Sequence, residues 1–171
     1  NKEHAEYLLN WCAFLVQKPD QIPEVAIVLK GAKGTGKGTL GNALMRFFGQ
    51  HAIQLASVYH LVSNFNAHFR DACFVFADEA FWPGDKSADG TLKRLITEPT
   101  LFIEKKGKDG VTTTNRTHLM MASNEEWIIP ATPGERRYFV LNVSDHKQQD
   151  LEWFGNINKQ MEEGGLEAML Y

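Results

Sequence analysis

A glycine-rich stretch, Gly31-Ala-Lys-Gly-Thr-Gly-Lys-Gly-Thr39, constrains the fold of this chain more than any other feature. It follows the apolar segment Val25–Lys30, which is typical of a buried parallel strand. After it, apolar residues recur at the i, i+3, i+4, i+7 spacing of a helix: Leu40, Ala43, Leu44 and Phe47. A glycine-rich loop between a strand and a helix directs several backbone N–H groups and the positive end of the helix dipole at one anion. We therefore predict a binding site for the phosphates of a nucleotide.

The spacing of the loop matches G-x-x-x-x-G-K, in which the lysine binds the β- and γ-phosphates. That lysine is Lys37 here. A Ser or Thr that binds magnesium normally follows it, but Gly38 takes this position and Thr39 is the expected substitute. The residues predicted to bind the nucleotide are Gly31, Gly34, Thr35, Gly36, Lys37, Gly38 and Thr39.

Two other interpretations of the loop explain fewer features of the sequence. Gly36-x-Gly38-x-x-Gly41 fits the dinucleotide-binding pattern, but that pattern begins directly at the end of a strand and requires an acid about 20 residues further on. Residues 31–35 intervene here, and Ala56–Leu61 contains no acid. A plain glycine-rich turn would explain neither Lys37 nor the strand–loop–helix context.

A second apolar segment, residues 73–77, ends in two acids, Asp78 and Glu79. In an enzyme with such a loop, the first acid orients the magnesium ion and the second polarises the attacking water. Strands also end in acids that only contact solvent. The pair therefore indicates a catalytic site only in combination with the glycine loop.

The apolar segment Leu119–Asn124 ends in an amide that could contact the γ-phosphate or the attacking water, although Ser123-x-x-Glu126 also fits a helix-capping box. Further on, Arg136 and Arg137 precede a predicted strand. These arginines are either solvated surface charges or an arginine finger, a cation that acts on the γ-phosphate held by a neighbouring subunit. Spacing does not choose between the two arginines.

Strands and helices alternate along the chain, which predicts an α/β sheet of parallel strands with helices on both faces. One of the helices is expected over about 57–69. Residues 101–106 and 111–114 are predicted to form a β-hairpin around 107–110, before the strand that ends at Asn124. The 171 residues fit one domain, with a helix in residues 1–20 packed on it. The net charge of −3 restricts any nucleic-acid binding to a local basic patch.

In this order, the glycine loop, the acids, the hairpin, the asparagine and the arginines resemble the superfamily 3 helicases, a branch of the AAA+ ATPases. The similarity is greatest to the helicase domain of phage and plasmid primase-helicases. Three segments carry it: N-E-E-W-I-I-P at 124–130, G-E-R-R-Y-F-V at 134–140, and M-E-E-G-G-L-E-A-M-L at 161–170. Together the motifs cover nearly the whole chain.

The resemblance implies a P-loop NTPase sheet of AAA+ type, with strand order 5-1-4-3-2, and a ring, usually a hexamer, with ATP at each subunit boundary. It implies that Thr39 and Asp78 position Mg²⁺. Glu79, Asn124 and either Arg136 or Arg137 would be catalytic. The hairpin would lie in the pore of the ring, where its lysines hold the phosphates of DNA, most simply a single strand: Lys105, Lys106 and Lys108.

On this basis we expect an ATP-dependent DNA helicase or translocase from a phage or plasmid replication protein, joined to a primase or polymerase domain in its parent chain. No apolar run approaches the roughly 18 residues that span a membrane, so we expect a cytoplasmic protein without a membrane partner. Two alternatives stay open. Gly36–Thr39 also resembles the loop of adenylate kinases, which are small-molecule phosphotransferases. An ATP-organised ring that binds DNA with little unwinding would carry the same motifs.

Overall fold

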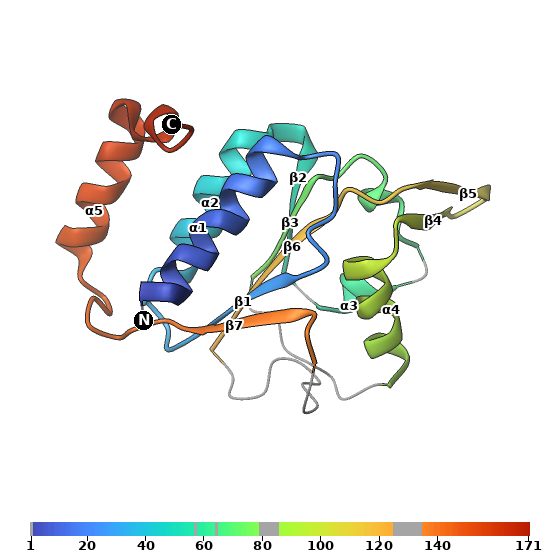
Figure 1. Ribbon diagram of the computed structural model, residues 1–171, viewed down its shortest axis with the longest axis horizontal. Helices are drawn as coiled ribbons and strands as arrows, with labels where there is room; N and C mark the ends of the chain where they lie inside the picture. The colour runs from blue at the N-terminus through green and yellow to red at the C-terminus, as the bar shows by residue number, and fades with distance from the viewer. Residues whose placement is uncertain (1, 57, 64, 79–85, 125–134) are drawn as a thin grey trace.

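The computed structural model describes residues 2–56, 58–63, 65–78, 86–124 and 135–171. Its centre is a sheet of five strands, all paired in parallel (Figure 1). The strands are β1 (Ala26–Lys30), β2 (Ala52–Leu55), β3 (Phe74–Ala77), β6 (His118–Ser123) and β7 (Tyr138–Asn142). They lie in the order β2-β3-β6-β1-β7. Numbered along the chain within this sheet and read from β7, that order is 5-1-4-3-2, and the predicted parallel α/β architecture is confirmed.

Helices cover both faces of this sheet, as expected. They are α1 (Lys2–Gln17), α2 (Lys37–Phe48), α3 (Val58–Val62), α4 (Lys86–Thr97), α5 (Leu151–Gln160) and α6 (Leu166–Ala168). A π-helical turn, Met161–Gly165, joins the last two. In Figure 1, α1 and α2 lie on one side of the sheet, α3 and α4 lie on the other, and α5 lies beyond α1 at the edge of the molecule. No helix in the described part of the chain has both the length and the apolar character to cross a membrane.

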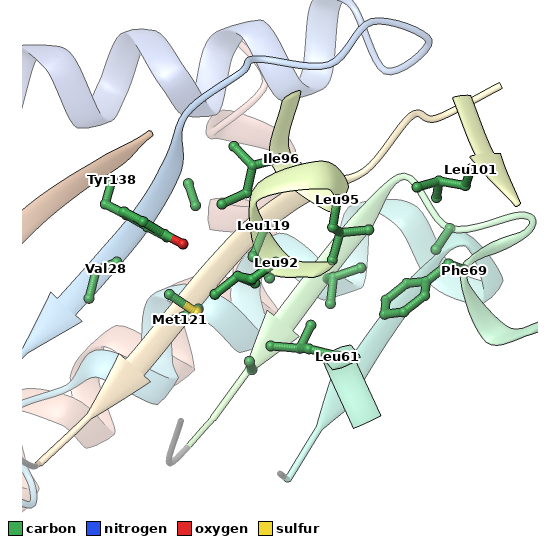
Figure 2. Close-up of a cluster of buried hydrophobic side chains, with 14 of the residues drawn as sticks. Val28, Leu61, Phe69, Leu92, Leu95, Ile96, Leu101, Leu119, Met121 and Tyr138 are labelled. Atoms are coloured by element: carbon green, nitrogen blue, oxygen red, sulfur yellow. The ribbon is translucent and has the colours of Figure 1, made fainter. Parts of the chain in front are cut away.

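Two hydrophobic cores hold the helices on the sheet. Successive side chains of a strand point to opposite faces, so each strand contributes to both cores. On one face Ile27 and Phe76 pack with Trp11 and Leu15 of α1. The other core contains residues from the strands and from α3 and α4, among them Val28, Leu61, Leu92, Leu95, Ile96, Leu119 and Met121 (Figure 2). The three central strands, β3, β6 and β1, are therefore buried on both faces, and polar sites can lie where these strands end.

The predicted helix over 57–69 is wrong in length. The structure has only α3, which ends at Val62, and a 3₁₀ turn at Ala67–Phe69. The hydroxyl of Ser63 donates to the carbonyl of Phe65, and the amide of Asn66 donates to the carbonyl of Phe102 at 2.8 Å. Such side-chain hydrogen bonds compete with helical backbone bonds, which explains the early end of the helix.

The predicted hairpin is confirmed as two antiparallel strands, β4 (Thr100–Lys105) and β5 (Lys108–Thr114). Its turn is shorter than the predicted 107–110, because Lys105 pairs directly with Lys108. Gly107 has a φ of 74°, a conformation that suits glycine in a tight turn. In Figure 1 the hairpin projects from the end of the molecule opposite α5.

Candidate functional site

Lys37 begins α2 and is buried at the carboxyl end of the sheet, beneath the glycine loop. Its Nζ atom donates hydrogen bonds to the carbonyls of Gly31 and Ala32, both at 2.7 Å, and to Oδ1 of Asn124 at 2.9 Å. Gly34 and Gly36 have φ angles of 76° and 90°, which side chains rarely tolerate. The loop therefore folds around the lysine, and glycine is needed where the predicted phosphate cradle bends.

Asn124 reaches Lys37 because of strand order. β6 lies beside β1, with Lys30 in register with Ser123, so the residues that follow these two strands meet at one edge of the sheet. Binding sites of open α/β sheets lie at this edge, outside the carboxyl ends of the strands. The structure therefore brings Asn124 against Lys37 of the glycine loop.

Asp78 follows β3, the next strand across the sheet, and lines the same cavity of about 460 Å³ as Thr39 and Asn124. Its Oδ2 accepts a hydrogen bond of 3.5 Å from the amide of Gln54. The same Oδ2 would lie 3.8 Å from a Cβ atom built on Gly38, so the carboxylate faces the start of α2. The structure thus brings both predicted metal ligands to the cavity.

These oxygen donors fit a magnesium ion. Mg²⁺ is usually bound by one or two protein oxygens together with water and substrate phosphates, and a dedicated protein cage is not needed. The described residues contain no cluster of three or more His, Cys, Asp or Glu side chains that could hold a metal. Burial lowers the pKa of Lys37, whereas the nearby charge of Asp78 acts in the opposite direction.

Glu79, the predicted catalytic base, lies outside the described residues. The sequence missed three residues of the segment before and within α5. The backbone N–H of Gln149 donates to Gly34, and the side-chain amide of Gln148 donates to Lys33, both at 2.9 Å. Phe154 lines the cavity. Nothing in their spacing relates these residues to a loop that precedes them by more than 100 positions.

Arg136 and Arg137 precede β7 and differ in their surroundings. Arg136 is exposed, whereas Nη1 of Arg137 donates to Oε1 of Glu135 at 3.0 Å. The Glu135 side chain is only 6% exposed, and its second oxygen lies 3.6 Å from Nζ of Lys93. Lys93 is also paired with Asp89 of α4 at 2.8 Å. Arg137 is thus part of an ion-pair network within its own chain, which we call the Glu135 network (Asp89, Lys93, Glu135, Arg137).

The charges of the Glu135 network shift the pKa of the Glu135 carboxyl group. Burial alone would raise the pKa of Glu135, but the hydrogen bonds and charge of Arg137, with the charge of Lys93, hold that pKa below its ordinary value. Glu135 therefore stays ionised and holds Arg137 against the start of β7.

Both arginines lie far from the glycine loop of their own chain. β1 and β7 are parallel and pair from Ala26 with Tyr138 to Lys30 with Asn142. The loop follows the carboxyl end of β1, and the arginines precede the amino end of β7. Five residues at about 3.3 Å each separate the two ends by about 16 Å. Neither arginine is therefore placed next to the glycine loop of its own chain.

The three predicted DNA-binding lysines, Lys105, Lys106 and Lys108, are exposed at the hairpin tip. They do not line the cavity around Lys37. The hairpin tip and the glycine loop are therefore separate parts of the structure.

Fold and site together define a mixed α/β structure with a glycine-rich loop and a cavity at the carboxyl edge of a parallel sheet. The chain belongs to DUF5906, a family of unknown function whose model matches residues 29–137. It is 29% identical over 149 residues to the DNA primase-polymerase of Nitratiruptor phage NrS-1, covering 85% of this chain and 20% of that protein. The chain thus spans about a fifth of this curated relative.

Solved structures with the same fold include the C-terminal region of the NrS-1 protein. Its apo form (residues 305–718) superposes with a TM-score of 0.85 at 24% identity, covering all of this chain and 42% of the other. A second apo form gives 0.80 at 25% identity, covering 99% and 41%. The JCV helicase, solved with a bound small molecule, gives 0.57 at 16% identity and covers 96% and 47%.

Proposed function

We propose that this chain is an ATP-hydrolysing motor domain of AAA+ type, within superfamily 3, that moves or unwinds DNA during phage or plasmid replication. The observation that carries the proposal is the meeting of Lys37, Asp78 and Asn124 around one cavity at the carboxyl edge of the sheet. The lysine begins the helix after the glycine loop, and the acid and the amide follow the two neighbouring strands β3 and β6. Such groups together bind and cleave a triphosphate. The similarity to a phage primase-polymerase and to a viral helicase fold supports the DNA-related part.

In this mechanism the loop amides and Lys37 bind the β- and γ-phosphates. To do so, Lys37 exchanges its hydrogen bonds to the loop carbonyls for phosphate oxygens. Thr39 and Asp78 would hold Mg²⁺, which when bound would supply positive charge against the phosphates. Glu79 accepts a proton from the attacking water, and Asn124 orients that water or the γ-phosphate. Asn124 already contacts Lys37, so the two can respond together to the γ-phosphate.

The arginine finger is Arg136 in this proposal. Arg137 is held by Glu135. Arg136 also precedes the amino end of β7, but it is exposed and free to enter the site of a neighbouring copy. Finger action between copies requires a homo-oligomeric ring, most simply a hexamer. The hairpin lysines of each copy would then line the pore and bind single-stranded DNA, in the cytoplasm of the host cell.

The test is ATP hydrolysis and strand displacement by the chain and by Glu79→Gln. The variant should bind ATP with unchanged affinity while its turnover falls, because only the proton acceptor is lost. Normal hydrolysis by Glu79→Gln would contradict the role of Glu79. An ATPase that is stimulated by DNA but displaces no strand would favour the DNA-binding ring over the motor.

A phosphotransferase of adenylate-kinase type requires several arginines around the phosphates. No arginine is present among the described residues that line the cavity. Transfer of phosphate from ATP to a nucleoside monophosphate without DNA would nevertheless replace the motor proposal with this alternative.

A further inference from the structure

Two chemically different kinds of side chain line the cavity around Lys37. Lys37, Asp78 and Asn124 are charged or amide groups that suit phosphates. Phe154 of α5 is the single aromatic residue among the described residues that line the cavity. A nucleoside triphosphate has two matching kinds of group, with charged phosphates at one end and a flat aromatic base at the other.

Phe154 lies directly against the glycine loop. A Cβ atom built on Gly36 would be 2.5 Å from Cε1 and 2.8 Å from Cζ of this ring, so the ring edge contacts the Gly36 backbone. Phe154 is half-buried, so part of its surface stays accessible. It therefore stands within the length of one nucleotide from the atoms that would hold the phosphates.

The position of Phe154 is set by specific bonds and not by burial of its helix, since no residue of α5 is buried. The hydrogen bonds of Gln148 and Gln149 to Lys33 and Gly34 attach the chain just before α5 to the loop. Asp150 then starts α5 by accepting a hydrogen bond of 2.9 Å from the backbone N–H of Trp153. The loop and the aromatic ring thus form one structural unit.

From this geometry we infer that Phe154 is the stacking platform for the nucleobase, and that it makes the site prefer purine over pyrimidine nucleotides. This inference rests on the proposed nucleotide site. Stacking on an aromatic ring depends on the area of the base and tolerates any base edge, so a purine gains more than a pyrimidine. Phe154 is a specificity-determining residue, and α5 is part of the nucleotide site.

The test measures the affinity of ATP, CTP and inorganic tripolyphosphate, each with Mg²⁺, for the chain and its variants. Phe154→Ala and Phe154→Leu should lower the affinity for ATP roughly 10-fold or more and lower the affinity for CTP by a smaller factor. The affinity for tripolyphosphate should stay unchanged. Phe154→Trp should retain the affinity for ATP. The matched control is Leu151→Ala, since Leu151 is on the same helix but 84% exposed and outside the cavity lining. It should change none of the three affinities.

Two results would overturn this inference. One is a Phe154→Leu variant that binds ATP as tightly as the unchanged chain. The other is an equal loss of ATP and tripolyphosphate in both variants, because Phe154 would then only shape the loop. Lys37→Ala separates the two levels of the account. If Lys37→Ala lowers the affinity for ATP and tripolyphosphate while the Phe154 variants leave the affinity for ATP unchanged, only the stacking inference is wrong. If Lys37→Ala weakens neither ligand, the nucleotide site itself fails.

Discussion

The Nζ atom of Lys37 donates a hydrogen bond of 2.9 Å to Oδ1 of Asn124, although 87 residues separate them in the chain. The bond joins the glycine loop after β1 to the end of the neighbouring strand β6. It gives Asn124 a defined position before any nucleotide binds. In the proposed mechanism, a γ-phosphate that competes for Lys37 would also release or reorient Asn124, which would link nucleotide binding to the residue proposed to orient the water.

Replacing Asn124 should therefore separate hydrolysis from binding. We expect Asn124→Ala to lower kcat for ATP hydrolysis roughly 100-fold while the Kd for ATP changes little, because Lys37 and the loop amides stay in place. Steady-state kinetics together with direct binding measure the two effects. Asn142→Ala is the matched control, since Asn142 ends β7 and does not line the cavity. Equal losses of binding and turnover in Asn124→Ala would contradict its role.

The two arginines should respond oppositely to substitution. Arg136→Ala should lower the ATPase rate roughly 10³-fold without changing thermal stability, as expected of an exposed finger. Arg137→Ala should lower the free energy of unfolding by about 1–3 kcal/mol, because it leaves the nearly buried Glu135 carboxylate poorly paired. Denaturant unfolding and ATPase assays measure both.

A mixture of two variants, Lys37→Ala and Arg136→Ala, tests whether Arg136 of one copy acts at the site of another copy. Lys37→Ala retains Arg136, and Arg136→Ala retains Lys37, so a mixed assembly contains some complete sites. Activity in the mixture above the sum of the separate variants is expected. A mixture no more active than its two components would argue against a finger supplied by a neighbour.

Acid should remove the contribution of Glu135 to stability. Its folded pKa lies below its ordinary value of 4.5, so the ionised form stabilises the fold above that pH. The contribution is lost as the pH falls from 4.5 through the folded pKa. The stability difference between the chain and Glu135→Gln should therefore be constant near neutral pH and shrink below pH 4.5. A difference that stays constant down to pH 3 would contradict the ion-pair network.

The hairpin lysines should determine the salt dependence of DNA binding. Each phosphate contact to a single strand contributes about −0.7 to the slope of log K against log salt. Replacing Lys105, Lys106 and Lys108 by Ala together should reduce the slope by about 2 and leave ATP binding unchanged, because the hairpin lies outside the cavity. Fluorescence anisotropy at several salt concentrations measures it. An unchanged slope would show that these lysines do not contact the DNA phosphates.

The sequence predicted the parts of the fold that depend on local pattern. The apolar strands, the glycine loop and the hairpin follow from periodicity and turn residues. Because parallel strands carry their sites at one edge, the meeting of Asp78 and Asn124 with the loop was also predictable. The length of the helix near Ser63 was not predictable, because the side chain of Asn66 donates a hydrogen bond to β4, a segment more than 30 residues away. The place of Phe154 depends on backbone bonds at Gln149 that no residue pattern reveals.

The most direct test of the motor proposal is the steady-state rate of ATP hydrolysis with and without single-stranded DNA. The chain should hydrolyse ATP, single-stranded DNA should stimulate the rate, and Lys37→Ala should abolish it. Lys159→Ala, a change in an exposed lysine paired only weakly with Glu163, should behave as the unchanged chain. Absence of hydrolysis under all conditions, or a rate that is unaffected by Lys37→Ala, would contradict the account.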